Sequence, residues 1–236
     1  MTGGEYPQAP PVIISTMSMD NLLDLQLDSW TLKVRPPLYG SERNPVIFLI
    51  HGWTGDERSM WVFAPRLPEN ALLIAPRAPY VSNHAKLGGY SWVEQRASQF
   101  SELSAFDPAL VSFDSLIAEL ARQYPEANFA NFGQMGFSQG AAFSFAYALR
   151  HSVRVNRLAA LAGFLPAGAE ERLTALAHIP VFIAHGTKDE TVPVAMAHEA
   201  RDVLASASVS VQYCESATGH KLGANCATLL AGFFKH

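Results

Sequence analysis

Charged residues are scarce in this sequence. Asp, Glu, Lys and Arg make up 16% of its 236 residues, against about 25% in an average soluble domain. Apolar residues account for 49%, which excludes an intrinsically disordered chain, because such chains combine low hydrophobicity with high net charge. The formal net charge is −4. Since non-specific binding of nucleic acids depends on clustered Lys and Arg, we expect no nucleic-acid partner.

Long apolar runs and cysteines are scarce as well. The longest apolar run, residues 158–169, contains Pro166 and is shorter than the roughly 20 residues of a membrane-spanning helix. The N-terminus lacks the basic and then apolar segments of a secretory signal. Cys214 and Cys226 form neither a C-x-x-C pair nor a disulfide framework. We therefore expect free thiols in a cytoplasmic protein without stable membrane insertion and without a bound metal.

The length suits one α/β domain. Residues 1–20 are rich in Gly and Pro and predict a flexible arm, which leaves residues 21–236 as a single domain. From Leu23 to Val34, apolar and polar residues alternate on either side of Asp28 and Ser29. This pattern predicts a β-hairpin with one buried face.

Continuous apolar runs follow the hairpin, and each is typical of a strand buried on both faces of a parallel sheet. They span residues 46–50, 71–75, 132–136, 158–162 and 181–184, and a more alternating run at 209–213 predicts an edge strand. Asp107 and Pro108 predict a helix start, with Asp107 as the N-cap. Further helices are expected at 139–150, 193–205 and 222–234. The order predicts a mostly parallel sheet with an N-terminal antiparallel hairpin and helices on both faces.

The motif with the clearest chemistry is Gly-Phe-Ser-Gln-Gly at residues 136–140. It follows an apolar strand and opens a helix, which is the setting of a Gly-x-Ser-x-Gly nucleophile elbow. The glycines allow the strand and the helix to approach closely. The helix N-terminus also places a positive partial charge where an oxyanion would form. The motif therefore predicts Ser138 as a nucleophile.

A serine hydroxyl needs a base that takes its proton. On this scaffold the acid and the histidine follow the serine in chain order, each after a later strand. Asp189 follows the strand at 181–184 and is preferred over Glu190 as the acid, and His220 follows the last strand as the base. His51 and His185 also stand at strand ends. Each is either a structural hydrogen-bonding residue, which we favour, or a direct proton-transfer group.

An oxyanion hole requires two backbone N–H groups. One is expected from Gln139, directly after the nucleophile, and the other from a loop after an earlier strand. Residues 51–55 form such a loop, in which Gly52 allows close approach of the backbone. We predict the backbone N–H of Trp53 as the second donor.

Four segments together resemble the phospholipase/carboxylesterase family of α/β-hydrolases, which includes acyl-protein thioesterases and small bacterial carboxylesterases. They read LIHGWTGDE at 49–57, GFSQGA at 136–141, HGTKDETVP at 185–193 and GH at 219–220. The resemblance implies an α/β-hydrolase fold and a triad of Ser138, Asp189 and His220. It also implies oxyanion donors at Trp53 and Gln139, and no cofactor.

A looser match concerns the substrate pocket. The segment GGYSW at 88–92 resembles a Trp-containing loop that borders the pocket in this family, although Glu94 stands where the family usually has Asp. The resemblance makes Trp53, Tyr90 and Trp92 candidate pocket residues. The stretch at 164–179 is too short for a lid domain, so we expect a pocket open to water.

These features predict a serine carboxylesterase that hydrolyses small to medium carboxylic esters through an acyl-enzyme on Ser138. Activity is expected to fall at acid pH as His220 becomes protonated, from a reference pKa of about 6.5. An acyl-thioesterase or lysophospholipase on the same triad is the alternative. A non-catalytic binding protein of this fold would usually lack one triad member. Apolar residues that are not buried in the core could form a surface for self-association, so a homodimer is also possible.

Overall fold

The computed structural model describes residues 22–40, 43–95 and 100–235. The arm predicted for residues 1–20 lies outside the described residues. Within the described ranges, no helix has both the length and the apolar character needed to cross a membrane.

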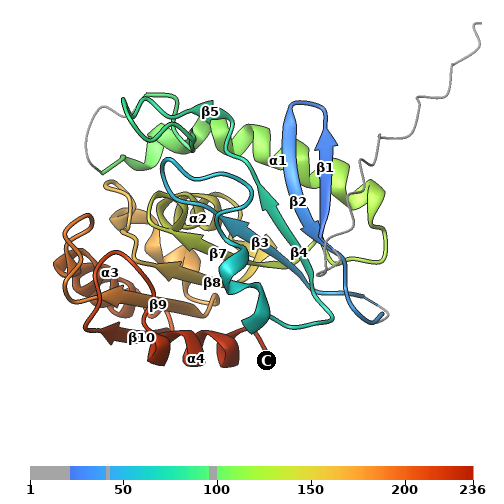
Figure 1. Cartoon of the computed structure of the whole chain (residues 1–236). Coiled ribbons are helices and arrows are strands. Elements are labelled where there is room, and N and C mark those ends of the chain that lie inside the picture. Colours follow the sequence, from blue (N-terminus) through green and yellow to red (C-terminus); the bar gives the residue numbers. More distant parts are fainter. Residues whose placement is uncertain (1–21, 41–42, 96–99, 236) are drawn as a thin grey trace, which may run out of the picture.

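An eight-stranded sheet runs through the molecule in the order β1-β2-β4-β3-β7-β8-β9-β10 (Figure 1). Its strands are β1 Leu23–Leu27, β2 Trp30–Arg35, β3 Val46–Ile50, β4 Leu72–Pro76, β7 Phe132–Phe137, β8 Val155–Leu161, β9 Val181–Gly186 and β10 Val211–Ser216. β1 and β2 are antiparallel to their neighbours, whereas all pairs from β4 to β10 are parallel. The predicted hairpin followed by a parallel sheet is confirmed.

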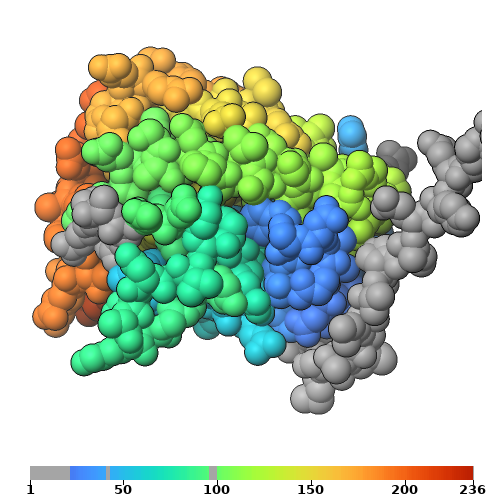
Figure 2. Space-filling view, turned by 90° about the horizontal axis from the view of Figure 1, so that it is seen from above, coloured from blue at the N-terminus to red at the C-terminus, as the bar shows by residue number. Residues whose placement is uncertain are grey.

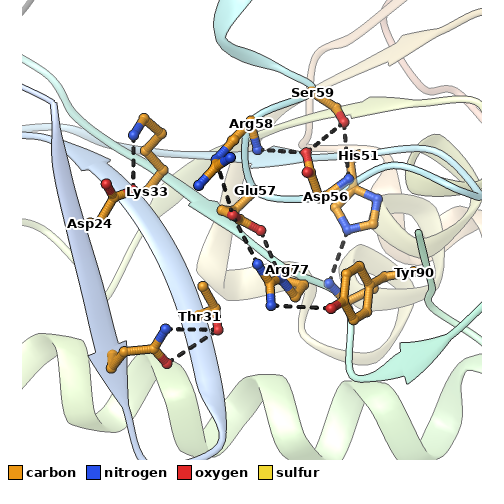
Figure 3. Close-up of polar contacts among 12 residues, drawn as sticks. Asp24, Thr31, Lys33, His51, Asp56, Glu57, Arg58, Ser59, Arg77 and Tyr90 are labelled. Atoms are coloured by element: carbon orange, nitrogen blue, oxygen red, sulfur yellow. Dashed lines mark hydrogen bonds and ion pairs between the residues drawn. The ribbon is translucent and has the colours of Figure 1, made fainter. Parts of the chain in front are cut away.

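The hairpin has one buried and one polar face, as its alternation predicts. Leu25 lies opposite Leu32, and both side chains are buried. On the polar face, Lys33 Nζ donates to Asp24 Oδ1 at 2.9 Å across the two strands (Figure 3). The turn places Asp28 at a φ of 50°, a conformation that Asp tolerates better than most residues. One period-two pattern therefore determines both strands and their register.

Every residue of β3, β4 and β9 is buried, because helices cover both faces of the sheet. The helices are α1 Asp107–Gln123, α2 Gln139–Arg150, α3 Val194–Ser206 and α4 Ala224–Phe233, and the short 3₁₀ turns are η1 Trp61–Arg66, η2 Leu103–Phe106, η3 Ser152–Arg154 and η4 Glu170–Leu176. The larger apolar cluster contains residues of α1, α2 and α3. The smaller one contains residues of α4 and η1, which lie across the sheet from α1 (Figure 1).

The start of α1 differs slightly from the prediction. Asp107 is the first residue of α1 and not its N-cap, because the turn η2 runs directly into the helix and Phe106 takes the cap position without a side-chain hydrogen bond. Pro108 still lies in the first turn, where its missing N–H costs nothing. The sequence therefore placed the helix correctly but not its cap.

A second, two-stranded sheet pairs β5 Tyr80–Val81 with β6 Tyr90–Ser91. Figure 2 shows the teal and green part of the chain that holds this segment beside the blue β1–β2 hairpin, with α1 in brighter green along the edge of both. β6 also joins the loop after β3: Thr54 N donates to Tyr90 O at 2.9 Å and Tyr90 N donates to Gly55 O at 2.9 Å. This small sheet therefore fixes the position of the loop at 51–55.

The cysteines correct a prediction from the sequence. Cys214 of β10 and Cys226 of α4 form a disulfide, with their Cα atoms 5.7 Å apart, so the expected free thiols are wrong. The chain leaves the sheet after β10, turns through residues 217–223 and returns along the sheet as α4. This return brings together two cysteines that are 12 positions apart in the sequence. No local cysteine motif predicts that they pair.

Candidate active site

Ser138 lies at the turn between β7 and α2. Its φ of 53° and ψ of −119° lie outside the allowed regions of ordinary residues, and such strain costs about 1–3 kcal/mol. Neighbouring elements hold the turn in place. Ser138 N donates to Leu161 O at 2.9 Å, and Ser138 O accepts from Ala141 N at 3.0 Å. The strained backbone is the conformation expected of a nucleophile elbow.

Two glycines make this turn possible. A Cβ atom on Gly136 would lie 2.2 Å from Gly140 O, and one on Gly140 would lie 2.2 Å from Ile50 O. No side chain fits at either position, so β7, α2 and the end of β3 can meet only over glycine. The residue pattern G-x-S-x-G is therefore a packing requirement of this turn.

Asp189 and His220 form a hydrogen-bonded pair. His220 Nδ1 lies 2.7 Å from Asp189 Oδ2, and Asp189 Oδ1 accepts the backbone N–H groups of Thr191 and Val192, each at 2.9 Å. The Asp189 side chain is fully buried, whereas that of His220 is 24% exposed. Because a carboxylate only accepts, Nδ1 of His220 carries the hydrogen and Nε2 remains an acceptor. Glu190, the alternative acid, is exposed.

Backbone contacts join the loops that carry the acid and the histidine. Thr187 N donates to Ser216 O at 2.8 Å and Lys188 N donates to Thr218 O at 2.9 Å. A Cβ atom on Gly186 would lie 2.2 Å from Gly219 O. The two loops are therefore packed backbone against backbone, which brings the segments that carry Asp189 and His220 together.

His51 braces the loop at residues 51–55 from inside. Its Nδ1 lies 2.7 Å from Gly52 O, and its Nε2 accepts the backbone N–H of Ala78 at 2.9 Å (Figure 3). Burial lowers the pKa of His51 to about 4, so the ring is neutral near pH 7, with its hydrogen on Nδ1. Both ring nitrogens are occupied by backbone groups, which supports the structural interpretation of His51.

Trp92 has a different place from the one predicted. Its side chain is 0% exposed, its Nε1 donates to His51 O at 2.8 Å, and its backbone N donates to Gln139 Oε1 at 3.0 Å. The Gln139 side chain also donates to Ser91 Oγ at 3.2 Å. Trp92 therefore holds His51 and Gln139 in place, and so stabilises the two segments that carry the expected oxyanion donors, Trp53 and Gln139.

Tyr90 belongs to a polar anchor behind the same loop. Glu57 is 2% exposed and forms two hydrogen bonds with Arg77, at 2.7 and 3.0 Å. Arg77 Nη1 donates to Tyr90 Oη at 3.1 Å, and the three side chains are seen together in Figure 3. The hydrogen bonds to Glu57 raise the pKa of Arg77. The sequence analysis missed this anchor, because the three residues are not neighbours in the chain.

Two cavities meet at Ser138 and His220, and Trp53 and Thr54 line both. One has a volume of about 550 Å³ and apolar walls of Met60, Val62, Phe63, Phe137 and Leu222. The other has a volume of about 490 Å³, with walls that include Leu87, Phe100, Phe164, Thr191 and Val192. Tyr90 and Trp92 line neither cavity. The predicted pocket residues are therefore corrected: Trp53 stays, and the other two lie behind the loop.

No His, Cys, Asp or Glu side chains in the described ranges gather in groups of three or more that could hold a metal ion. Ser138 shares both cavities with His220, which is hydrogen-bonded to Asp189. This arrangement suits proton transfer and stabilisation of a developing oxyanion.

A strand-to-helix serine turn, with an Asp–His pair after later strands of a mostly parallel sheet, defines the α/β-hydrolase fold. The sequence matches the phospholipase/carboxylesterase family over residues 39–225. The chain belongs to this family and is a hydrolase.

Solved structures of hydrolases share the fold. A carboxylesterase from Mesorhizobium loti superimposes with a TM-score of 0.74 at 22% identity, covering 90% of this chain and 97% of that one. Esterase PE8 gives a TM-score of 0.72 at 24% identity, over 86% and 96%. Acyl-protein thioesterase 2 from Zea mays gives 0.67 at 20% identity, over 85% and 96%. A comparison with curated protein sequences gave no match.

Proposed function

We propose that this protein is a serine carboxylesterase that hydrolyses small to medium carboxylic esters through an acyl-enzyme on Ser138. The observation that carries the proposal is the Asp189–His220 hydrogen bond of 2.7 Å, made to a fully buried carboxylate beside cavities that Ser138 and His220 both line. A hydrogen-bonded acid and histidine next to a strained serine is the arrangement that activates a serine hydroxyl.

In the first half of the reaction, Ser138 Oγ attacks the ester carbonyl carbon while His220 Nε2 takes the hydroxyl proton. The carbonyl oxygen becomes an oxyanion and accepts the backbone N–H groups of Trp53 and Gln139. The C–O bond to the alcohol then breaks, and the alcohol leaves with the proton from His220. Asp189 keeps the hydrogen on Nδ1 of His220 and stabilises the imidazolium.

In the second half, water attacks the acyl group on Ser138. His220 again takes a proton, this time from the water, and returns it to Ser138 Oγ as the acid leaves. The two halves require the same groups, so any change that moves His220 slows both acylation and deacylation.

The two cavities support a substrate with a bound group on each side of the scissile bond. Both have apolar walls, which favours an acyl group on one side and an alcohol group on the other.

An acyl-thioesterase or a lysophospholipase is the second candidate. Val62 and Leu87 support it, because these cavity residues are 66% and 69% exposed and would extend the apolar walls for a longer chain. Turnover of esters of graded acyl length against matched thioesters separates the candidates.

A fluorophosphonate probe tests the nucleophile. The wild type is expected to be labelled, and Ser138→Ala is expected to stay unlabelled and to lose about 10⁴-fold or more in kcat. Ser144→Ala is the matched control, because Ser144 is a buried serine of α2, the helix that begins directly after Ser138, and it donates to Gly140 O. An unlabelled wild type, or equal labelling of Ser138→Ala, refutes the proposal.

A small-molecule ester as the partner, a homodimer and a cytoplasmic location remain predictions from the sequence. The Cys214–Cys226 disulfide weighs against the cytoplasmic location, because disulfides persist mainly in oxidising compartments. Alkylation of thiols in intact cells, followed by mass spectrometry, separates the two. Alkylated cysteines support a cytoplasmic protein, and an intact disulfide supports an oxidising compartment.

A further inference from the structure

A second histidine contacts the acid of the proposed triad. His185 is the penultimate residue of β9, and its side chain is 0% exposed. Its Nε2 lies 2.8 Å from Val192 O and 3.4 Å from Asp189 Oδ2. His220 Nδ1 lies 2.7 Å from the same oxygen. Two imidazoles therefore meet at one carboxylate oxygen, one at the cavities and one enclosed in the protein.

The contacts of His185 determine where its hydrogen sits. A backbone carbonyl only accepts, so Nε2 carries the hydrogen that Val192 O receives. Nδ1 is buried and has no hydrogen-bond partner among the described residues. A hydrogen on Nδ1 would be a buried donor without an acceptor, which is costly. His185 therefore acts as a donor through Nε2, and it lines neither cavity, so it is not placed to take a proton from the substrate.

These bonds close the acid loop on itself. Val192 N donates to Asp189 Oδ1 at 2.9 Å, and Val192 O accepts from His185 Nε2 at 2.8 Å. Val192, three positions after the acid, is thus held at both its N–H and its carbonyl, and His185 connects it to the end of β9. Rotation of the Asp189 carboxylate away from His220 would break its bonds to the backbone and its contact with His185.

We propose that His185 is a positioning residue for Asp189. Its Nε2–H holds Val192 O and contacts Asp189 Oδ2, so that the carboxylate presents this oxygen to His220. The inference rests on the proposed function, because positioning Asp189 matters only if the Asp189–His220 pair works in ester hydrolysis. It assigns His185 to hydrogen bonding and not to proton transfer, the alternative that the sequence left open.

Three variants test the donor at Nε2. In His185→Gln, the side-chain amide reaches about as far as Nε2 and keeps a donor there. In His185→Asn, the same amide is one methylene shorter and falls short of Val192 O.

With a short p-nitrophenyl ester, we expect kcat of His185→Asn to fall about 10- to 100-fold, the effect of a catalytic group misplaced by about 1 Å. KM should change less than about twofold, because the substituted position lines neither cavity. His185→Gln should stay within about threefold of the wild type, because it keeps the donor. His185→Met, similar in length but without a donor, should behave as His185→Asn does and replaces it if that variant does not fold.

Ile183→Val is the matched control. Ile183 is a buried residue of the same strand, and loss of one methyl group lowers stability without touching the acid, so its kcat should equal that of the wild type. Unfolding midpoints are measured for all variants, and the assays are run where all are folded.

An unchanged kcat in His185→Asn or His185→Met overturns the inference. So does an equal fall in His185→Gln, because the donor would then not matter. These outcomes are distinct from failure of the proposed function, which appears as a wild type that neither hydrolyses the ester nor reacts with the fluorophosphonate. That last result removes the basis of the inference as well.

Discussion

The Cys214–Cys226 disulfide should contribute measurably to the stability of the protein. It joins β10 to α4 across a sequence separation of 12. In the chain-entropy account, closing a loop of this length lowers the entropy of the unfolded chain by about 2.1 + 1.5R ln 12, or roughly 9.5 cal/mol/K. At 25 °C this corresponds to about 3 kcal/mol. Total stabilities of natural domains are about 5–15 kcal/mol, so the effect should be large.

Reduction is the cleanest perturbation, because it leaves the sequence unchanged. With an m-value of about 2–3 kcal/mol per molar urea, loss of about 3 kcal/mol should lower the unfolding midpoint by about 1–1.5 M. Urea unfolding with and without a phosphine reductant measures the shift. The variant Cys214→Ala/Cys226→Ala is the control, since its midpoint should already be low and should not respond to the reductant.

The same loop connects the disulfide to the site. His220 lies between the two cysteines, so opening the disulfide removes the covalent link that closes the segment carrying the proposed base. We expect kcat to fall on reduction before the protein unfolds. Two results would refute this reasoning: an unchanged midpoint after mass spectrometry has shown complete reduction, or full alkylation of both cysteines without any reductant.

Two further predictions concern the core and the pH dependence of stability. Gln134 is 0% exposed, and neither of its amide atoms has a hydrogen-bond partner among the described residues. Gln134→Met, with a similar volume and no amide, should therefore raise the free energy of unfolding by about 1–3 kcal/mol, and a lower urea midpoint would contradict this. Burial lowers the pKa of His51 to about 4, against about 6.5 in the unfolded chain. The unfolded state therefore takes up a proton first, and stability that is complete above pH 6.5 should fall by about 3 kcal/mol as the pH drops to 4. His51→Gln should lack this part of the acid loss in urea unfolding at pH 7.5 and pH 4, and an identical loss in both proteins would argue against it.

Local patterns predicted most of the fold. The alternation of Leu25 and Leu32 with polar neighbours predicted the hairpin, and the continuous apolar runs predicted the buried parallel strands. Such patterns are reliable because the side-chain period of a strand and its burial on one or both faces act on each residue directly. The cap of α1 was misplaced by one residue because the preceding turn η2, and not the propensity of Asp107, determines where the helix begins.

Some residues of the candidate site could also be predicted from the sequence. Ser138 was predicted because a strained turn between a strand and a helix tolerates only glycine at Gly136 and Gly140. Asp189 and His220 were predicted from their places after later strands, since the carboxyl ends of parallel strands meet at one edge of the sheet. The structure brings these two side chains together at 2.7 Å. Their chain order therefore carried enough information to pair them.

Pairing between distant side chains is what only the tertiary structure decided. The sequence by itself determined the hairpin, the buried strands, the serine turn and the order of acid and histidine, because each depends on a local pattern or on strand order. It did not determine that Trp92 lies behind the loop at 51–55, that Cys214 reaches Cys226, or that His185 contacts Asp189. Such contacts depend on strand register and on the paths of the returning loops, which are set by the packing of the whole chain.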